Sequence, residues 1–295
     1  MNKTTCIACR LLVVALTLGF VSCNRLDVPG MFINRSDTEK RVADWLDWNE
    51  QHDSFVLDSV PDSYVFYSCS DLHINDNNDR FAAFVTAERN DPNAIFSIAA
   101  GDLANESGDR PYKLCEEAMA FDPAIHAKND PCFPIIGNHD VYFDCAEYFK
   151  KHFHTSTYTV TVKTVSGYQD LFIFLDSGNG THGSRQMEWL ENKLASRQLY
   201  RSCFVISHNW LFRTVYNYTE TPASNLPEEE QYAFMDLMSR KNVTMVIMGH
   251  YHYRDAKTFN GVRYVMTDNL NNDQDTPTYL VVRISGKISY EYREL

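Results

Sequence analysis

Five apolar segments of this sequence are each followed at once by side chains that bind metals or transfer protons. They are Asp71-Leu72-His73, Gly101-Asp102, Gly137-Asn138-His139-Asp140, Ser207-His208 and Gly249-His250-Tyr251-His252. Alone, an Asp-x-His or a Gly-Asp is common, whereas Gly-Asn-His-Asp is expected by chance in roughly one chain in a thousand of this length. The occurrence of all five in order therefore indicates a functional site.

The residue types indicate a metal centre. Asp, His and Asn supply oxygen and nitrogen donors of the kind that hold Zn, Mn or Fe, and the set contains no thiolate. The seven candidate ligands are Asp71, His73, Asp102, Asn138, His208, His250 and His252. Because seven ligands are too many for one ion, the set suits two ions that share a carboxylate.

Alternating strands and helices position these residues. From residue 63 the chain reads as strand, polar loop and helix, and the pattern repeats through residues 63–74, 93–105 and 132–140. Buried strands that alternate with helices predict a largely parallel sheet. Ligands bind at the carboxyl ends of such strands, so we expect the five polar segments to lie at one edge.

The second half of the chain adds hairpins to this pattern. Residues 157–165 alternate in polarity and a turn at 166–170 precedes another apolar run, which predicts a β-hairpin. A second hairpin closes the chain on Ser285-Gly286. Near the start, helical spacing after Ser36-Asp37-Thr38-Glu39 predicts an amphipathic helix over 37–51. We expect one domain over residues 36–295.

The first residues are typical of a leader for export. Lys3 and Arg10 precede a short apolar run that ends near Val21 and is too brief to span a bilayer. Phe20-Val21-Ser22-Cys23 resembles a bacterial lipoprotein cleavage box. This predicts a signal peptide over 1–22, a lipid on Cys23, a tether over 23–35, and a periplasmic or outer-membrane, cell-surface protein anchored to the membrane.

Composition excludes some classes of protein. The net charge of −12 disfavours broad binding of nucleic acids, whose phosphate backbone is also negative. Cleavage of the leader and lipidation of Cys23 would leave five cysteines, namely Cys69, Cys115, Cys132, Cys145 and Cys203. An odd number without tight spacing does not form a disulfide framework, and Cys69 and Cys203 lie in apolar runs typical of the core.

Together the motifs resemble the calcineurin-like metallophosphoesterase superfamily, whose pattern runs D-x-H, G-D, G-N-H-D/E, H and G-H-x-H. The resemblance extends from about residue 63 to the end. It implies a four-layer αββα sandwich of two mixed β-sheets with flanking helices. It also implies that Asp71, His73, Asp102 and His252 hold one ion, that Asp102, Asn138, His208 and His250 hold the other, and that Asp102 bridges.

The resemblance further implies a reaction. A metal-bridging hydroxide would attack a small phosphodiester or phosphomonoester, with two Mn, Fe or Zn ions. His139 would bind the phosphoryl group and protonate the leaving oxygen, while Asp140 would fix the tautomer of the His139 imidazole.

The sequence also bears on the subclass within this superfamily and on two alternative functions. Purple acid phosphatases have Gly at the position of His73 and Tyr at that of Asn105, so that subclass is disfavoured. A catalytically inactive metal-binding surface module and an exported nuclease are the alternatives. The presence of His139 and Asp140 argues against the first, and the acidic charge argues against the second.

Overall fold

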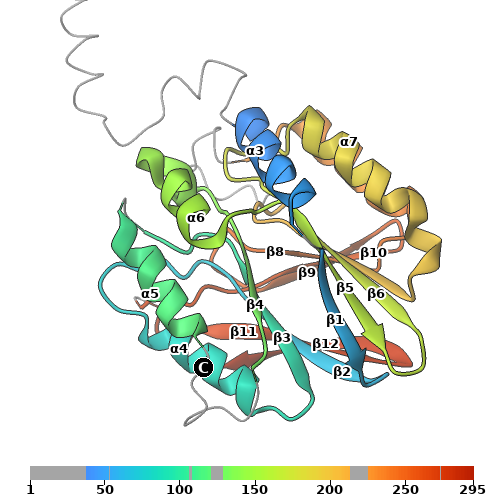
Figure 1. Cartoon of the computed structure of the whole chain (residues 1–295), viewed down its shortest axis with the longest axis horizontal. Helices are drawn as coiled ribbons and strands as arrows, with labels where there is room; N and C mark the ends of the chain where they lie inside the picture. The colour runs from blue at the N-terminus through green and yellow to red at the C-terminus, as the bar shows by residue number, and fades with distance from the viewer. Residues whose placement is uncertain (1–37, 53, 106–107, 121–128, 213–224, 273) are drawn as a thin grey trace, which may run out of the picture.

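Two mixed β-sheets pack face to face in a computed structural model of the chain, and helices cover both outer faces (Figure 1). The structure describes residues 38–295 except 53, 106–107, 121–128, 213–224 and 273. The expected four-layer αββα sandwich is therefore confirmed. The expected signal peptide, lipidated Cys23 and tether lie outside the described residues.

The larger sheet has seven strands. In spatial order they are β1 (Phe55–Val60), β5 (Tyr158–Thr164), β6 (Gln169–Phe174), β7 (Ser202–Ile206), β8 (Met245–Met248), β10 (Val262–Met266) and β9 (Asp255–Phe259). β5 and β6 form the expected antiparallel hairpin, and β6, β7, β8 and β10 run parallel. The sequence did not reveal β1, most of whose side chains are exposed or half-buried.

The smaller sheet has five strands. In spatial order they are β12 (Lys287–Glu294), β11 (Thr278–Ser285), β2 (Tyr64–Cys69), β3 (Ala94–Ala100) and β4 (Cys132–Ile135). β2, β3 and β4 are parallel, and β11 and β12 form the expected closing hairpin. The parallel strands of each sheet therefore end at a common edge.

Aromatic rings fill the space between the sheets. Phe66 of β2 stacks on Phe96 of β3, with ring centroids 5.2 Å apart, and meets Phe172 and Phe204 of the other sheet edge-on. All four side chains are fully buried. This packing holds the two sheets, and hence their strand ends, in a fixed relation.

Helices cover the outer faces. The six α-helices of the described residues are α3 (Thr38–Glu50), α4 (Asp79–Asn90), α5 (Asp109–Met119), α6 (Cys145–Phe153), α7 (Ser184–Lys193) and α8 (Glu228–Arg240). Apolar side chains of α4, α5 and α6 pack on the five-stranded sheet, and those of α7 and α8 pack on the seven-stranded sheet. Two 3₁₀ helices, η1 (His139–Asp144) and η2 (Leu194–Leu199), complete the described elements. Within these residues, no helix is both long and apolar enough to cross a membrane.

Helix α3 matches the predicted helix over 37–51 closely. Figure 1 shows it beside α7, between that helix and α6. The carboxylate of Glu39 accepts hydrogen bonds from the backbone N–H and hydroxyl of Ser184, at the start of α7. Glu39 thus supplies acceptors to the first turn of a neighbouring helix.

The described cysteines form no disulfide. Cys69, Cys115, Cys132, Cys145 and Cys203 are free thiols, and Cys69 and Cys203 are fully buried in the core, as expected.

Candidate metal centre

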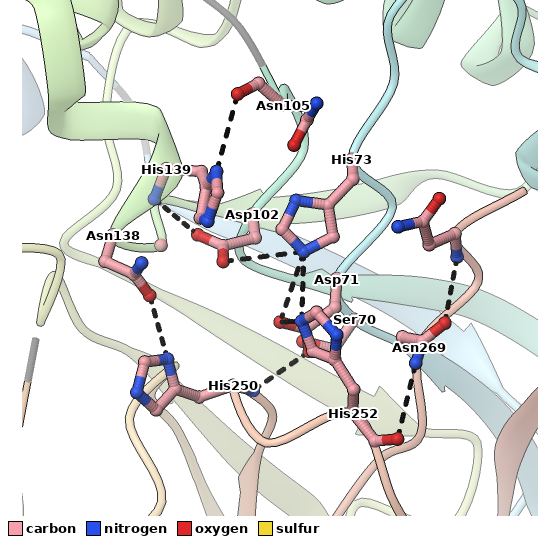
Figure 2. A network of polar contacts seen from close by, with 12 residues as sticks. Ser70, Asp71, His73, Asp102, Asn105, Asn138, His139, His250, His252 and Asn269 are labelled. Atoms are coloured by element: carbon pink, nitrogen blue, oxygen red, sulfur yellow. Dashed lines mark hydrogen bonds and ion pairs between the residues drawn. The ribbon is translucent and has the colours of Figure 1, made fainter. Parts of the chain in front are cut away.

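The seven predicted ligands converge just beyond the carboxyl ends of β2, β3, β4, β7 and β8, and Figure 2 shows all of them except His208. The first group joins Asp71 and His73, after β2, with His252, after β8. The Nε2 atoms of His73 and His252 lie 3.0 Å apart, and Asp71 Oδ1 lies 3.3 Å from His252 Nε2. Two imidazole nitrogens that face each other across a carboxylate are arranged as ligands of a common cation.

The second group is formed by Asp102, Asn138, His208 and His250. Asn138 Oδ1 lies 2.8 Å from His250 Nδ1 and 3.1 Å from His208 Nε2. Asp102, His208 and His250 also form a group whose potential ligand atoms lie within 4.8 Å of one another. All four residues are buried.

Asp102 lies between the two groups. Its Oδ2 is 3.8 Å from His73 Nε2 and 3.4 Å from His208 Nε2. Its Oδ1 accepts a 2.7 Å hydrogen bond from the backbone N–H of His139. This is the position that a bridging carboxylate requires.

Several of the predicted ligands have a strained backbone conformation. Nine described residues other than glycine have a positive φ, and five of them are Asp71, His73, Asp102, His250 and His252. Side chains disfavour this left-handed region, and such residues cluster at functional sites that the surrounding structure holds in place.

Two glycines of the motifs are required by close contacts. A Cβ added at Gly137 would overlap Asp102 Oδ1 and the Asp102 backbone nitrogen. A Cβ at Gly249 would overlap Ser70 Oγ and lie 2.7 Å from Asp71 Oδ2. The two glycines thus let neighbouring strand ends approach the carboxylates of the site.

Comparison with protein families decides the identity of the fold. The family model described as calcineurin-like phosphoesterase matches residues 64–254, which contain every residue of both groups. The chain belongs to the calcineurin-like phosphoesterase family. No curated protein sequence matched it significantly.

Solved structures with the calcineurin-like fold resemble the chain at low identity. A dimetal phosphatase from Danio rerio has a TM-score of 0.56 at 12% identity, with 78% of this chain and 96% of that chain covered. GAP50, described as the anchor in the inner membrane complex of Plasmodium, has a TM-score of 0.58 at 14% identity, with coverages of 79% and 84%. The purple acid phosphatase PPD1 from yellow lupin has a TM-score of 0.56 at 13% identity, with 79% of this chain but 52% of that chain covered. These likenesses show the fold.

The donor set of this family member fits two metal ions. Asp71 Oδ1 is buried and makes no well-aligned hydrogen bond with a described residue, although Nε2 atoms of His73, His208 and His252 lie within 4.0 Å of it, that of His252 at 3.3 Å. A buried carboxylate oxygen without a donor is costly, and a cation would satisfy it. The hard oxygen and imidazole donors suit Mn, Fe or Zn.

The electrostatics of the site also favour positive charge. Burial alone would raise the pKa of Asp102, but the imidazoles around it, His208 first, hold that pKa well below its usual range. Burial alone would lower the pKa of His208, but Asp102 and then Asp71 raise it to about 10. The carboxylates thus stabilise a cation at their centre.

Two other imidazoles of the site, those of His73 and His250, resist protonation. Burial lowers the pKa of His73 to about 4 despite the two nearby carboxylates. Burial, and then the charge of His208, lower the pKa of His250 to about 3. Both rings are therefore neutral near pH 7, the form that binds metals.

His139 lies beside the two groups and is partly exposed. Its ring centroid is 4.5 Å from that of His73, and with His73 and Asp102 it forms a third potential ligand group. His139 Nδ1 faces the carbonyl oxygen of Asn105 at 3.4 Å, a long contact in which Nδ1–H is the donor (Figure 2).

The expected contact between Asp140 and His139 is not made. The fully buried carboxylate of Asp140 accepts hydrogen bonds from the N–H groups of Leu103, Ala104 and Gly137 and from the hydroxyl of Tyr112, at 2.9 to 3.1 Å. We therefore correct the role expected for Asp140: it does not set the tautomer of His139. It ties the loop that carries Asp102 to the turn that carries Asn138.

Burial and then the charge of Asp102 raise the pKa of Asp140 to about 6, while the hydrogen bonds from Ala104, Gly137 and Leu103 oppose this shift. The hydrogen bonds thus favour the ionised form that holds the two loops together.

The remaining described histidines lie outside the metal centre. His152 pairs with Asp109 and Glu116, and exposed His52 and His154 stack on Trp48. His182 is fully buried, with its Nε2 3.0 Å from Ser207 Oγ. His126 lies outside the described residues.

The sequence interpretation missed one polar strand end. Asp176 and Ser177 directly follow the apolar run of β6, and both are fully buried near the site. Asp176 binds Arg41 and Trp45 of α3, and Ser177 contacts the backbone of His208. The rule used for the other five strands would have found this pair, but no ligand motif marked it.

Proposed function

We propose that this protein is a metal-dependent phosphoesterase that hydrolyses small phosphate esters. The observation that carries the proposal is the position of Asp102 between two groups of ligands, with His139 beside them. Family membership supports hydrolysis of phosphoesters as the reaction class.

The residues of each group have separate tasks. Asp71, His73, Asp102 and His252 would hold one ion, and Asp102, Asn138, His208 and His250 the other. Two such ions, when bound, supply activation of water and neutralisation of charge at a phosphoryl group. The buried, hydrogen-bonded framework keeps the ligands in fixed positions, so little reorganisation is needed during the reaction.

His139 is the residue placed to act on the substrate. It is partly exposed and His252 is exposed, while Asp71, Asp102 and His208 are buried. The substrate therefore approaches from the side of His139 and His252. From there a protonated His139 would donate a proton to the leaving oxygen, which would otherwise depart as an alkoxide.

Small diesters and monoesters are the proposed substrates. The net charge of −12 disfavours long nucleic acids, because the chain repels their backbone. Of the two classes we place phosphodiesters first, because the intact D-x-H and G-N-H-D motifs resemble the phosphodiesterase-like members.

A panel of substrates tests this proposal. Residues 24–295 would be purified, loaded separately with Mn, Fe or Zn, and assayed on bis-p-nitrophenyl phosphate, p-nitrophenyl phosphate, nucleotides and pyrophosphate. We expect turnover of at least one ester that chelation abolishes and added metal restores. Bound metal without turnover of any ester would contradict the proposal and favour a non-catalytic surface module; GAP50, which has this fold, is described as an anchor.

We also propose that the protein is exported and anchored by a lipid on Cys23. The support is the apolar leader with Ser22-Cys23 at its end. Expressed in a bacterium fed a labelled fatty acid, the full chain should take up label and fractionate with membranes. The Cys23→Ala variant should not take up label, and equal labelling of both chains would contradict the anchor.

A further inference from the structure

Helix α3 precedes the segment that matches the phosphoesterase family, yet it binds a buried loop next to the metal centre. Arg41 donates to both carboxylate oxygens of Asp176, from Nε at 2.8 Å and from Nη2 at 3.0 Å. Trp45 Nε1–H donates to the same carboxylate at 3.0 Å. Arg41, Trp45 and Asp176 are all buried, so this is an interior anchor.

The next residue connects the anchor to His208. Ser177 Oγ accepts hydrogen bonds from the backbone N–H groups of His208, at 3.2 Å, and Asn209, at 3.3 Å. His208 Nε2 in turn lies 3.4 Å from Asp102 Oδ2. Ser177 therefore holds the backbone of His208, whose imidazole also faces the carbonyl oxygen of Ala100 at 2.9 Å.

The residue after that connects the anchor to Asn138. The N–H of Gly178 donates to Asp176 Oδ1 at 3.0 Å, so the carboxylate that binds Arg41 also fixes Gly178. A Cβ at Gly178 would lie 2.7 Å from the carbonyl oxygen of Gly137, which shows how closely the two backbones pack. Gly137 immediately precedes Asn138.

We propose that α3 is a positioning element for one of the two metal positions, the one formed by Asp102, Asn138, His208 and His250. Arg41 and Trp45 fix Asp176, and residues 176–178 fix His208 and Asn138. No such contact joins α3 to Asp71, His73 or His252 among the described residues, so the anchor reaches the other position only through the shared Asp102, and we expect a much smaller effect there. The inference rests on the two-ion assignment made for the proposed function.

The anchor matters because metal ligands must be held closely in place. Residues that orient ligands typically change metal affinity by about 10–100-fold when they are substituted. Loss of Arg41 leaves the Asp176 carboxylate buried without its ionic partner, which favours movement of the loop toward water.

The test measures metal binding by the purified chain, with no substrate present. Arg41→Met and Trp45→Phe remove the two donors, and Arg41→Lys keeps the charge but loses the two-pronged contact. We expect Arg41→Met and Trp45→Phe to lower the affinity for one of two Mn(II) ions by about 10–100-fold. The affinity for the other ion should stay within about threefold of wild type. The affinity of Arg41→Lys for the first ion should lie between those of Arg41→Met and wild type. Isothermal titration calorimetry and metal analysis after dialysis give both affinities.

A matched control lies on the same helix. Asp44 of α3 pairs with Lys150 of α6 at 2.7 Å, at a partly exposed position far in sequence from the anchor loop. Asp44→Asn should leave the affinities for both ions unchanged. Thermal unfolding of each apo-protein separates a loss of folding from a selective loss of one ion.

Double variants identify the position affected. In an Asn138→Ala background, Arg41→Met should cause little further loss of Mn(II) affinity. In a His252→Ala background, Arg41→Met should still lower the affinity for the remaining ion. Equal weakening of both ions in step with the melting temperature, or unchanged binding in Arg41→Met, would overturn the inference. A wild-type chain that binds two ions but hydrolyses no ester would contradict the proposed function alone.

Discussion

The backbone N–H of His139 donates a 2.7 Å hydrogen bond to Asp102 Oδ1. This contact joins the end of β4 to the end of β3 and leaves Asp102 Oδ2 facing His73 and His208. The backbone of His139 and the Asp102 carboxylate are therefore fixed relative to each other. The group proposed to protonate the leaving oxygen is held at a set place beside the proposed metal bridge.

His139→Ala should lower kcat by about 10²–10⁴-fold while both ions stay bound, because a general acid contributes about that much. The loss should be larger for alkyl esters than for p-nitrophenyl esters, whose leaving group needs no proton. His154→Ala, which removes an exposed imidazole stacked on Trp48, is the matched control and should match wild type. If His139→Ala instead loses an ion, His139 is a ligand, and the role assigned to it is wrong.

Gly137→Ala should displace Asp102, since the new methyl group would overlap its carboxylate and backbone nitrogen. A displacement near 1 Å can cost about 100-fold in rate, so we expect a fall of that order together with weaker metal binding. Gly286→Ala is the control, because a Cβ there meets nothing within 4 Å. Wild-type kinetics for Gly137→Ala would show that the close approach is not required.

Asp140→Asn should destabilise the fold and weaken metal binding together. The substitution places an amide NH₂ beside the four groups that now donate hydrogen bonds to Asp140. We expect this to lower the free energy of unfolding by about 1–3 kcal/mol. Tyr112→Phe, which removes one of these donors and has no contact with His139, should give a milder version of the same change. Denaturant unfolding and metal titration measure both effects. A shifted pH–rate profile with unchanged stability and metal affinity would restore the role in setting the His139 tautomer.

The Asp176–Arg41 pair should make stability depend on pH in the acid range. Burial alone would raise the pKa of Asp176, but Arg41 lowers it below its usual value. The stabilisation is thus fully present above the unfolded pKa of about 4 and is lost as pH falls through the lower folded pKa. The stability difference between wild type and Asp176→Asn should therefore be largest above about pH 5 and shrink toward pH 3. A difference that stays constant in denaturant titrations across this range would contradict the ionised pair.

Much of the fold and of the candidate site could be predicted from the sequence, because the signals are local. Each ligand motif follows an apolar strand directly, so hydrophobic pattern and residue type sufficed to expect that Asp71, Asp102, Asn138, His208 and His250 meet at strand ends. The expectation of one sheet edge was wrong, because the strands belong to two sheets that pack face to face. The two hairpins and the helix α3 were also readable from local periodicity.

Contacts between distant residues were not predictable. The partners of Asp140 lie 28 to 37 positions earlier, apart from Gly137, and Arg41 lies 135 positions before Asp176. No spacing rule relates such residues, and the neighbour of Asp140 in sequence, His139, was a misleading choice of partner. Strand β1 was missed because half-exposed edge strands lack a strong hydrophobic pattern.

The number of ions held by the wild-type chain and by Asp102→Asn tests the central claim most directly. After dialysis against Mn(II), metal analysis should give two ions per wild-type chain. The Asp102→Asn variant, which keeps its shape but loses the shared charge, should bind both ions at least about 100-fold more weakly. One ion in the wild type, or two ions held equally well by both chains, would contradict a two-metal centre bridged by Asp102.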